Sequence, residues 1–115
     1  MQLTDFYRMV HGDYDEVKGR LMTDERILKY LRKFPCMDDY ENLEKALEAG
    51  QWQDAFRFSH NLKGMCMNLG LQSLYEPACA LCENLRGGSP AQPCGPVMEA
   101  VAAGFSQTTS LIAML

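Results

Sequence analysis

The sequence predicts an all-α fold, an antiparallel four-helix bundle with one or two short N-terminal helices. Apolar residues recur with helical spacing, and no segment alternates apolar and polar residues as a half-buried strand does. The connections between the predicted helices are short, which favours antiparallel neighbours. The chain has 115 residues and is 47% hydrophobic, enough for one core, so we expect a single domain over residues 1–115.

The first third of the chain carries three helical segments. Residues 3–10 place their apolar side chains on one side of a short helix. A second segment follows Asp13, whose spacing from Glu16 is that of a capping box. A third follows Thr23, a favourable N-cap residue, and Pro35 ends it. These signals account for the short helices expected beside the bundle.

Three predicted helices of the bundle follow in the next part of the chain. One begins at Asp38 or Asp39 and ends near Gly50. The next extends to about residue 69 with a heptad-like apolar seam made of Ala55, Leu62, Cys66 and Leu69, with Ser59 on the same line. The third follows Gly70 and contains Pro77, which deletes one backbone hydrogen bond. We therefore expect a kink or a displaced start in that helix.

The end of the chain predicts a loop and a last helix. Residues 87–96, GGSPAQPCGP, carry several glycine and proline turn signals. The last helix follows and extends from Val97 to Leu115. Between residue 87 and the C-terminus the only charged side chain is that of Glu99. We therefore expect this quarter of the chain to be mostly buried.

Charge and composition exclude several classes of protein. The net charge of −4 argues against binding nucleic acid by neutralising its phosphates. No secretory signal is visible, because Asp5 and Arg8 interrupt the N-terminal region. The tail from residue 97 is too polar to span a membrane. The five cysteines are an odd number and indicate the reduced thiols of a cytoplasmic protein, with no membrane association.

Two of the cysteines, Cys79 and Cys82, have the Cys-x-x-Cys spacing of metal and redox sites. No second Cys-x-x-Cys or Cys-x-x-His follows them. We interpret them as small core residues and expect no metal site in this chain.

The most informative residues surround His60. On a helix, His60 lies about 100° from the buried line of Ser59, at the boundary between core and solvent. Lys63 lies on the same face, and Gly64 costs a helix about 1 kcal/mol relative to alanine. Because helical side chains lean toward the N-terminus, a side chain at position 64 would overhang the imidazole. An open nucleophile, a nearby cation and no bulk above it predict a histidine that accepts and releases a phosphoryl group.

This segment resembles the histidine phosphotransfer (HPt) domains of bacterial and fungal phosphorelays. The resemblance covers roughly residues 22–86, and the last helix by pattern only. The matching residues are His60-Asn61-Leu62-Lys63-Gly64, Leu69-Gly70, Leu71-Gln72 and the upstream Leu47-Glu48-Ala49-Gly50-Gln51-Trp52. It implies a phosphocarrier in which His60 exchanges a phosphoryl group with receiver-domain aspartates, Lys63 supports the phosphorylated state, and Gly64 gives clearance.

The resemblance also implies the partners, which are response-regulator receiver domains and a hybrid histidine kinase. Magnesium would belong to the receiver, so we expect no cofactor here. The chain lacks a glycine-rich nucleotide loop, so it is not expected to be an enzyme with its own ATP site. We expect it to act as a monomer.

Three further residues on the His60 face are candidates for partner docking. Phe56 and Met67 flank the histidine, and they are either semi-buried seam residues or an adaptable apolar patch for a receiver helix. Arg57 shares this face, and its simpler interpretation is a solvated cation.

Two other functions remain open at this point. One is an HPt-shaped adaptor that docks receiver or kinase domains without carrying phosphate. The other is a bundle that holds haem or a metal through His60 and a cysteine, which requires inward ligands where the helical phase places His60 outward.

Overall fold

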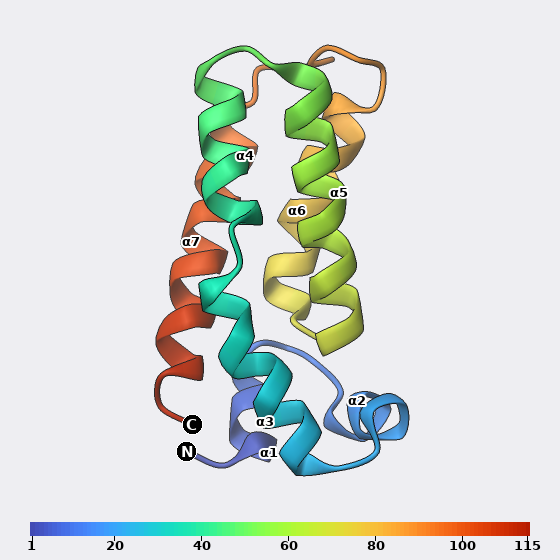
Figure 1. Ribbon diagram of the computed structural model, residues 1–115, viewed down its shortest axis with the longest axis vertical. Coiled ribbons are helices and arrows are strands. Elements are labelled where there is room, and N and C mark those ends of the chain that lie inside the picture. The colour runs from blue at the N-terminus through green and yellow to red at the C-terminus, as the bar shows by residue number, and fades with distance from the viewer.

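Helical spacing of apolar residues produces an all-α structure in the computed structural model, which covers residues 1–115 (Figure 1). It contains seven α-helices, one short 3-10 helix and no strand, so the predicted fold class is confirmed. The elements are α1 (Leu3–Met9), α2 (Tyr14–Leu21), α3 (Asp24–Lys33), the 3-10 helix η1 (Phe34–Cys36), α4 (Asp39–Glu48), α5 (Trp52–Leu69), α6 (Gln72–Leu85) and α7 (Gly95–Ile112).

Helices α4 to α7 form an antiparallel bundle along the long axis of the molecule (Figure 1). Each packs against the next in chain order, and α5 and α6 share the largest contact. Helix α3 rises from the lower end and passes through η1 into α4, where Pro35 occupies the first turn of η1. The short helices α1 and α2 cover the lower end of the bundle. The architecture is therefore the predicted four-helix bundle, and three helices precede it where one or two were predicted.

The predicted caps of α2 and α3 and the predicted seam of α5 are also confirmed. The Asp13 carboxylate accepts a hydrogen bond from the backbone N–H of Glu16 (3.2 Å), and the Thr23 hydroxyl accepts one from that of Arg26 (3.2 Å). The buried residues of α5 are the predicted ones, Ala55, Ser59, Leu62, Cys66 and Leu69. They join a core to which all seven helices contribute.

The expectation that the last quarter of the chain is mostly buried is wrong. Between residue 87 and the C-terminus only Val101, Thr108, Leu111 and Ile112 are buried. Apart from Glu99 and Met114, the exposed positions carry small or uncharged polar side chains, which water accommodates without any charge. Scarcity of charge therefore did not signal burial here.

Two helix boundaries differ from the prediction. Helix α7 begins at Gly95, inside the predicted loop of residues 87–96, because a proline in the first turn has no N–H to leave unpaired. It ends at Ile112 rather than at Leu115. Helix α6 begins at Gln72 and continues through Pro77 to Leu85, so its start is not displaced.

None of the helices is long and apolar enough to cross a membrane.

Candidate functional site

The candidate site lies halfway along α5, on the outer surface of the helix. His60 is exposed, whereas the neighbouring Ser59 is fully buried and donates a hydrogen bond to the carbonyl of Phe56 (2.8 Å). The outward position predicted for His60 is confirmed. Its ring therefore does not point into the bundle, as a haem or metal ligand would have to. No cluster of three or more His, Cys, Asp or Glu side chains suits a metal ion.

The side of His60 that faces α6 is walled by an aromatic ring. The ring of Phe56 is half-buried, and its centroid lies 6.1 Å from that of His60 at an interplanar angle of 43°. The guanidinium carbon of Arg86 lies 5.5 Å from the centre of the Phe56 ring. Arg86 also donates to Glu83 (2.6 Å), which lowers the pKa of that carboxyl. Phe56 thus lies between the histidine and a charged pair at the C-terminal end of α6.

Lys63, one turn beyond His60, carries a cation without a partner. Of the eleven Lys and Arg side chains, six form ion pairs with carboxylates, and Lys63 is not among them. Its charge also contributes to the lowered pKa of Glu83, so the two groups interact across the α5–α6 boundary. An unpaired ammonium beside an exposed imidazole is available to an anion attached to that ring.

No packing contact within this chain requires a glycine at position 64. A Cβ built on it meets no atom within 4 Å. Alanine would therefore fit, and would stabilise the helix by about 1 kcal/mol. The glycine lines an open depression between α5 and the start of α4, together with His60, Asn61, Met65, Asn68, Met37 and Asp39. Its lack of a side chain keeps the surface beside His60 open to a partner.

The three predicted docking residues all lie on α5 around His60, in different settings. Met67 is 61% exposed, whereas Phe56 is half-buried against Arg86. Arg57 forms an ion pair with Asp54 (3.3 Å) and lies over the ring of Phe58. Their role in docking stays a prediction.

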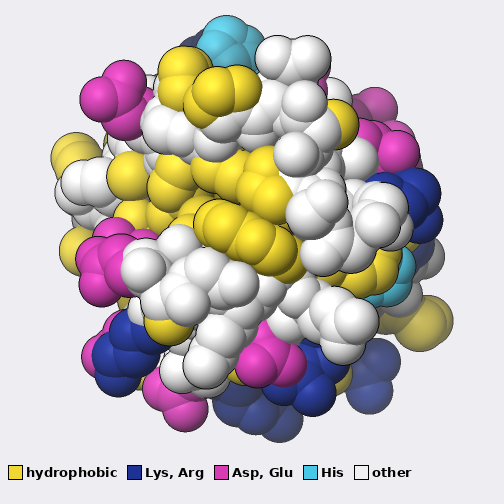
Figure 2. All heavy atoms as spheres, turned by 90° about the horizontal axis from the view of Figure 1, so that it is seen from above, with side chains coloured by type: hydrophobic (Ala, Val, Ile, Leu, Met, Phe, Trp, Pro, Cys, Tyr) yellow, Lys and Arg dark blue, Asp and Glu magenta, His cyan; other side chains and the backbone are white.

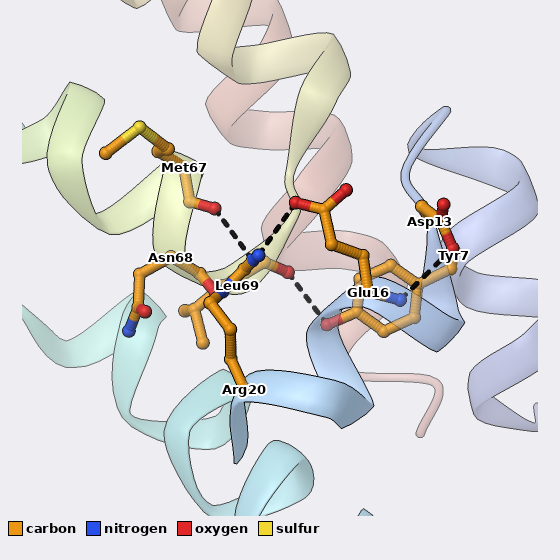
Figure 3. Close-up of polar contacts among 7 residues, drawn as sticks. All are labelled: Tyr7, Asp13, Glu16, Arg20, Met67, Asn68 and Leu69. Carbon is orange, nitrogen blue, oxygen red and sulfur yellow. Dashed lines mark hydrogen bonds and ion pairs between the residues drawn. The ribbon is translucent and has the colours of Figure 1, made fainter. Parts of the chain in front are cut away.

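The C-terminal end of α5 is held by contacts that the sequence did not reveal. Arg20 donates to the carbonyls of Met67 (3.1 Å) and Asn68 (2.9 Å), and the buried Tyr7 hydroxyl donates to that of Leu69 (2.8 Å) (Figure 3). These carbonyls lie in the last turn of the helix, where the N–H four residues further on is no longer available to pair with them. The partners are 47 to 62 positions away in the chain, so no local pattern signals them.

Gly70 ends α5 in a Schellman motif. Its φ is +68°, the N–H of Leu71 donates to the carbonyl of Cys66 (2.9 Å), and its own N–H donates to that of Met67 (3.4 Å). A Cβ on Gly70 would lie 2.5 Å from Cγ2 of Val17 on α2. Backbone conformation and close packing therefore both require glycine here.

The groups buried at this end are closed to solvent. Burial raises the pKa of the Tyr7 hydroxyl and raises that of the Cys66 thiol to about 12. His11, the only other histidine, is exposed in the turn after α1 with a φ of +58°. The chain thus contains one histidine on an open helix face, His60, and one in a turn.

Comparison with known proteins agrees with this geometry. The model of the Hpt domain family matches residues 35–110, more than half of the chain, and the match includes His60, Lys63 and Gly64. No curated protein and no solved structure matches the chain. Domains of this family are phosphorelay phosphocarriers without an ATP site of their own, and they interact with receiver domains and kinases. The chain therefore belongs to the Hpt domain family.

Proposed function

We propose that this chain is a phosphorelay phosphocarrier that accepts a phosphoryl group on His60 and donates it to the aspartate of a receiver domain. The observation that carries the proposal is Gly64, a helix-weakening residue beside the exposed His60 that nothing in the fold requires. Clearance for a bulky partner explains it. The unpaired ammonium of Lys63 on the same face supplies the charge that a phosphoryl group needs.

The proposed transfer involves the imidazole and the aspartyl phosphate of the receiver. A ring nitrogen of neutral His60 uses its lone pair to form the N–P bond while the P–O bond to the aspartate breaks. The carboxylate leaves with the electron pair of that bond, and the N–H of the other ring nitrogen stays in place. The reverse sequence returns the group to a second receiver. Such transfer depends on positioning and charge neutralisation more than on covalent chemistry from the carrier.

Each residue of the site has a proposed part in this step. Lys63 neutralises charge on the phosphoryl oxygens, and Gly64 lets the receiver approach. Phe56, Arg57 and Met67 contact the docked receiver. Magnesium is supplied by the receiver, so the carrier itself uses no cofactor, and the proposed form is a cytoplasmic monomer that also serves a hybrid histidine kinase.

Phosphoryl exchange with a phosphorylated receiver domain tests this proposal. The wild type and the His11→Gln variant, which keeps His60, should take up the phosphoryl group at equal rates. The His60→Gln variant should take up none while retaining its helical circular dichroism. If the wild type binds the receiver without taking up phosphate, the carrier function is overturned in favour of a docking adaptor.

A further inference from the structure

Four of the five unpaired cations in this protein lie on one helix, α3. Every other Lys or Arg forms an ion pair with a carboxylate, apart from Lys63 beside the histidine. All four are exposed, and we call them the cationic face of α3: Arg26, Lys29, Arg32 and Lys33. Unpaired cations are therefore concentrated at two places, the histidine face and α3.

The charges on α3 have little local compensation. Asp24 in the first turn pairs with Lys18 of α2, which leaves Glu25 as the only other acid of the helix. The ammonium of Lys33 lies 6.0 Å from the ring centre of Tyr30, which is 42% exposed. In Figure 2, Lys and Arg side chains lie along the lower and right-hand margins of the molecule, with acidic side chains among them. The protein as a whole carries a net charge of −4, so this face is opposite in sign to the rest.

The cationic face adjoins the depression that contains His60. Met37, which follows η1, lines that depression together with His60 and Gly64. Lys33 precedes Met37 by four residues of mainly 3-10 conformation, or about 8 Å at 2 Å per residue. Helix α3 also packs directly against α5.

A partner that reaches His60 will also meet part of this face. A stable interface buries about 800 Å² on each side, a disc of about 16 Å radius. Such a disc over His60 and its depression extends across Met37 to the C-terminal turn of α3. The two cations of that turn, Arg32 and Lys33, then lie at the rim of the contact.

We propose that the cationic face of α3 is the part of the docking surface that recognises an acidic surface on the protein exchanging phosphoryl groups with His60. This inference rests on the proposed function and adds the electrostatic character of the partner. A folded protein fits better than a nucleic acid or a membrane, because the face is only about 15 Å long and adjoins the histidine depression. Residues 24–33 lie outside the matched range 35–110 of the family model.

Rim charges of this kind act mainly on the rate of association. They steer an oppositely charged partner to the site, and salt screens the effect. The wild-type rate of transfer from a receiver should therefore fall as salt rises, whereas labelling by a small phosphoryl donor should not depend on α3.

The test compares two double variants with the same net charge. Lys29→Glu/Lys33→Glu reverses two charges on α3, and Arg8→Glu/Lys45→Glu reverses two exposed cations on α1 and α4 that pair locally with Asp5 and Glu41. The probe is the phosphorylated receiver domain that loads His60 fastest in a panel of receivers. At low salt the α3 variant should take up phosphate from the receiver about tenfold more slowly than the wild type, and its rate should depend less on salt. The rate of the control variant should stay within twofold of the wild-type rate. Phosphoramidate should label all three proteins equally.

Several results would overturn the inference. Equal slowing in both double variants would leave only the effect of net charge. Retention of the wild type on phosphatidylserine vesicles or duplex DNA, lost in the α3 variant at unchanged transfer rates, would assign the face to a polyanion. If phosphoramidate labels His60 but no receiver does, the docking inference fails while the chemistry of His60 stands. If phosphoramidate does not label His60, the proposed function fails as well.

Discussion

One glycine lies in the middle of α5 and another ends the helix. The two positions require glycine for opposite reasons. Gly70 has a φ of +68°, and a Cβ on it would collide with Val17. Gly64 sits within the helix, and a Cβ on it would meet nothing. The first glycine is required by the fold of this chain. The second is explained only by something outside it.

The surroundings of the two glycines differ in the same way. The end of α5 is closed by hydrogen bonds from Tyr7 and Arg20, whereas the middle presents an exposed His60 and an unpaired Lys63. The closed end holds the helix in place against α1 and α2. The open middle has little to do with stability, so its residues point to contact with a partner.

Replacing Gly70 should have the largest effect on stability. Gly70→Ala should lower the free energy of unfolding by about 3 kcal/mol, because a positive φ costs about 1 kcal/mol and the clash with Val17 adds about 2 kcal/mol. Gly50→Ala is the matched control, since Gly50 has a φ of +67° but its Cβ would meet only Trp52, at 3.7 Å. Its expected loss is about 1 kcal/mol. Equal losses in urea denaturation would contradict the packing account of Gly70.

Alkaline conditions should loosen the closed end. The folded pKa values of Tyr7 and Cys66 are raised, so the unfolded chain loses these protons first as the pH rises. The stability they contribute is complete below about pH 8, and each group then removes about 1.4 kcal/mol per pH unit above its unfolded pKa. Urea denaturation between about pH 9 and pH 11 should give a shallower decline for Tyr7→Phe than for the wild type. Equal slopes would contradict the burial of that hydroxyl.

Gly64→Ala should separate function from stability. The free energy of unfolding should rise by about 0.5–1 kcal/mol, and phosphoryl transfer from a receiver domain should slow about tenfold. Gly19→Ala is the matched control, because Gly19 also lies within a helix and its Cβ would meet nothing. It should gain similar stability at an unchanged transfer rate. If both variants transfer at the wild-type rate, Gly64 does not serve clearance.

Removing the Arg20 side chain should weaken the closed end of α5 and leave the histidine face unchanged. Arg20→Met leaves the Asn68 carbonyl to water and the Met67 carbonyl with only its bond from Gly70, and should lower the free energy of unfolding by about 1 kcal/mol. Arg8→Met, which removes an exposed pair with Asp5, should change it by less than about 0.5 kcal/mol. Both variants should still be phosphorylated at His60. Loss of labelling in folded Arg20→Met would contradict the separation of the two regions.

Lys63→Gln should have the smallest effect. Without the ammonium, the phosphohistidine should lose phosphate about threefold faster, the effect of an exposed charge interaction of about 0.6 kcal/mol. Arg57→Gln serves as control, because Arg57 is occupied by Asp54. The half-life of the labelled protein, followed by mass spectrometry, distinguishes the two. An unchanged half-life in Lys63→Gln would remove this residue from the site.

Local sequence signals predicted what local physics determines. The caps at Asp13 and Thr23, the seam of α5 and the outward position of His60 all follow from spacing along the chain, and the structure has them. The low charge of the last quarter of the chain led to a wrong prediction of burial, because small uncharged side chains also suit an exposed helix face. Absence of charge is a weaker signal than apolar periodicity.

The contacts that close α5 were not predictable from the sequence. Tyr7 and Arg20 reach carbonyls 47 to 62 positions away, and a backbone carbonyl leaves no trace in residue type. The sequence shows four cations on residues 24–33, but which of them lack an ion pair depends on side chains from other helices. The same holds for Gly64, whose empty surroundings appear only in three dimensions.

Chemical labelling shows whether His60 is the residue that carries the phosphoryl group. Wild type, His60→Gln and His11→Gln are incubated with phosphoramidate and their intact masses are measured. The wild type and His11→Gln should each gain one phosphoryl group, labile in acid and stable in base, and His60→Gln should gain none. Equal labelling of His60→Gln, or no labelling of the wild type under conditions that charge another phosphotransfer domain, would contradict this role of His60.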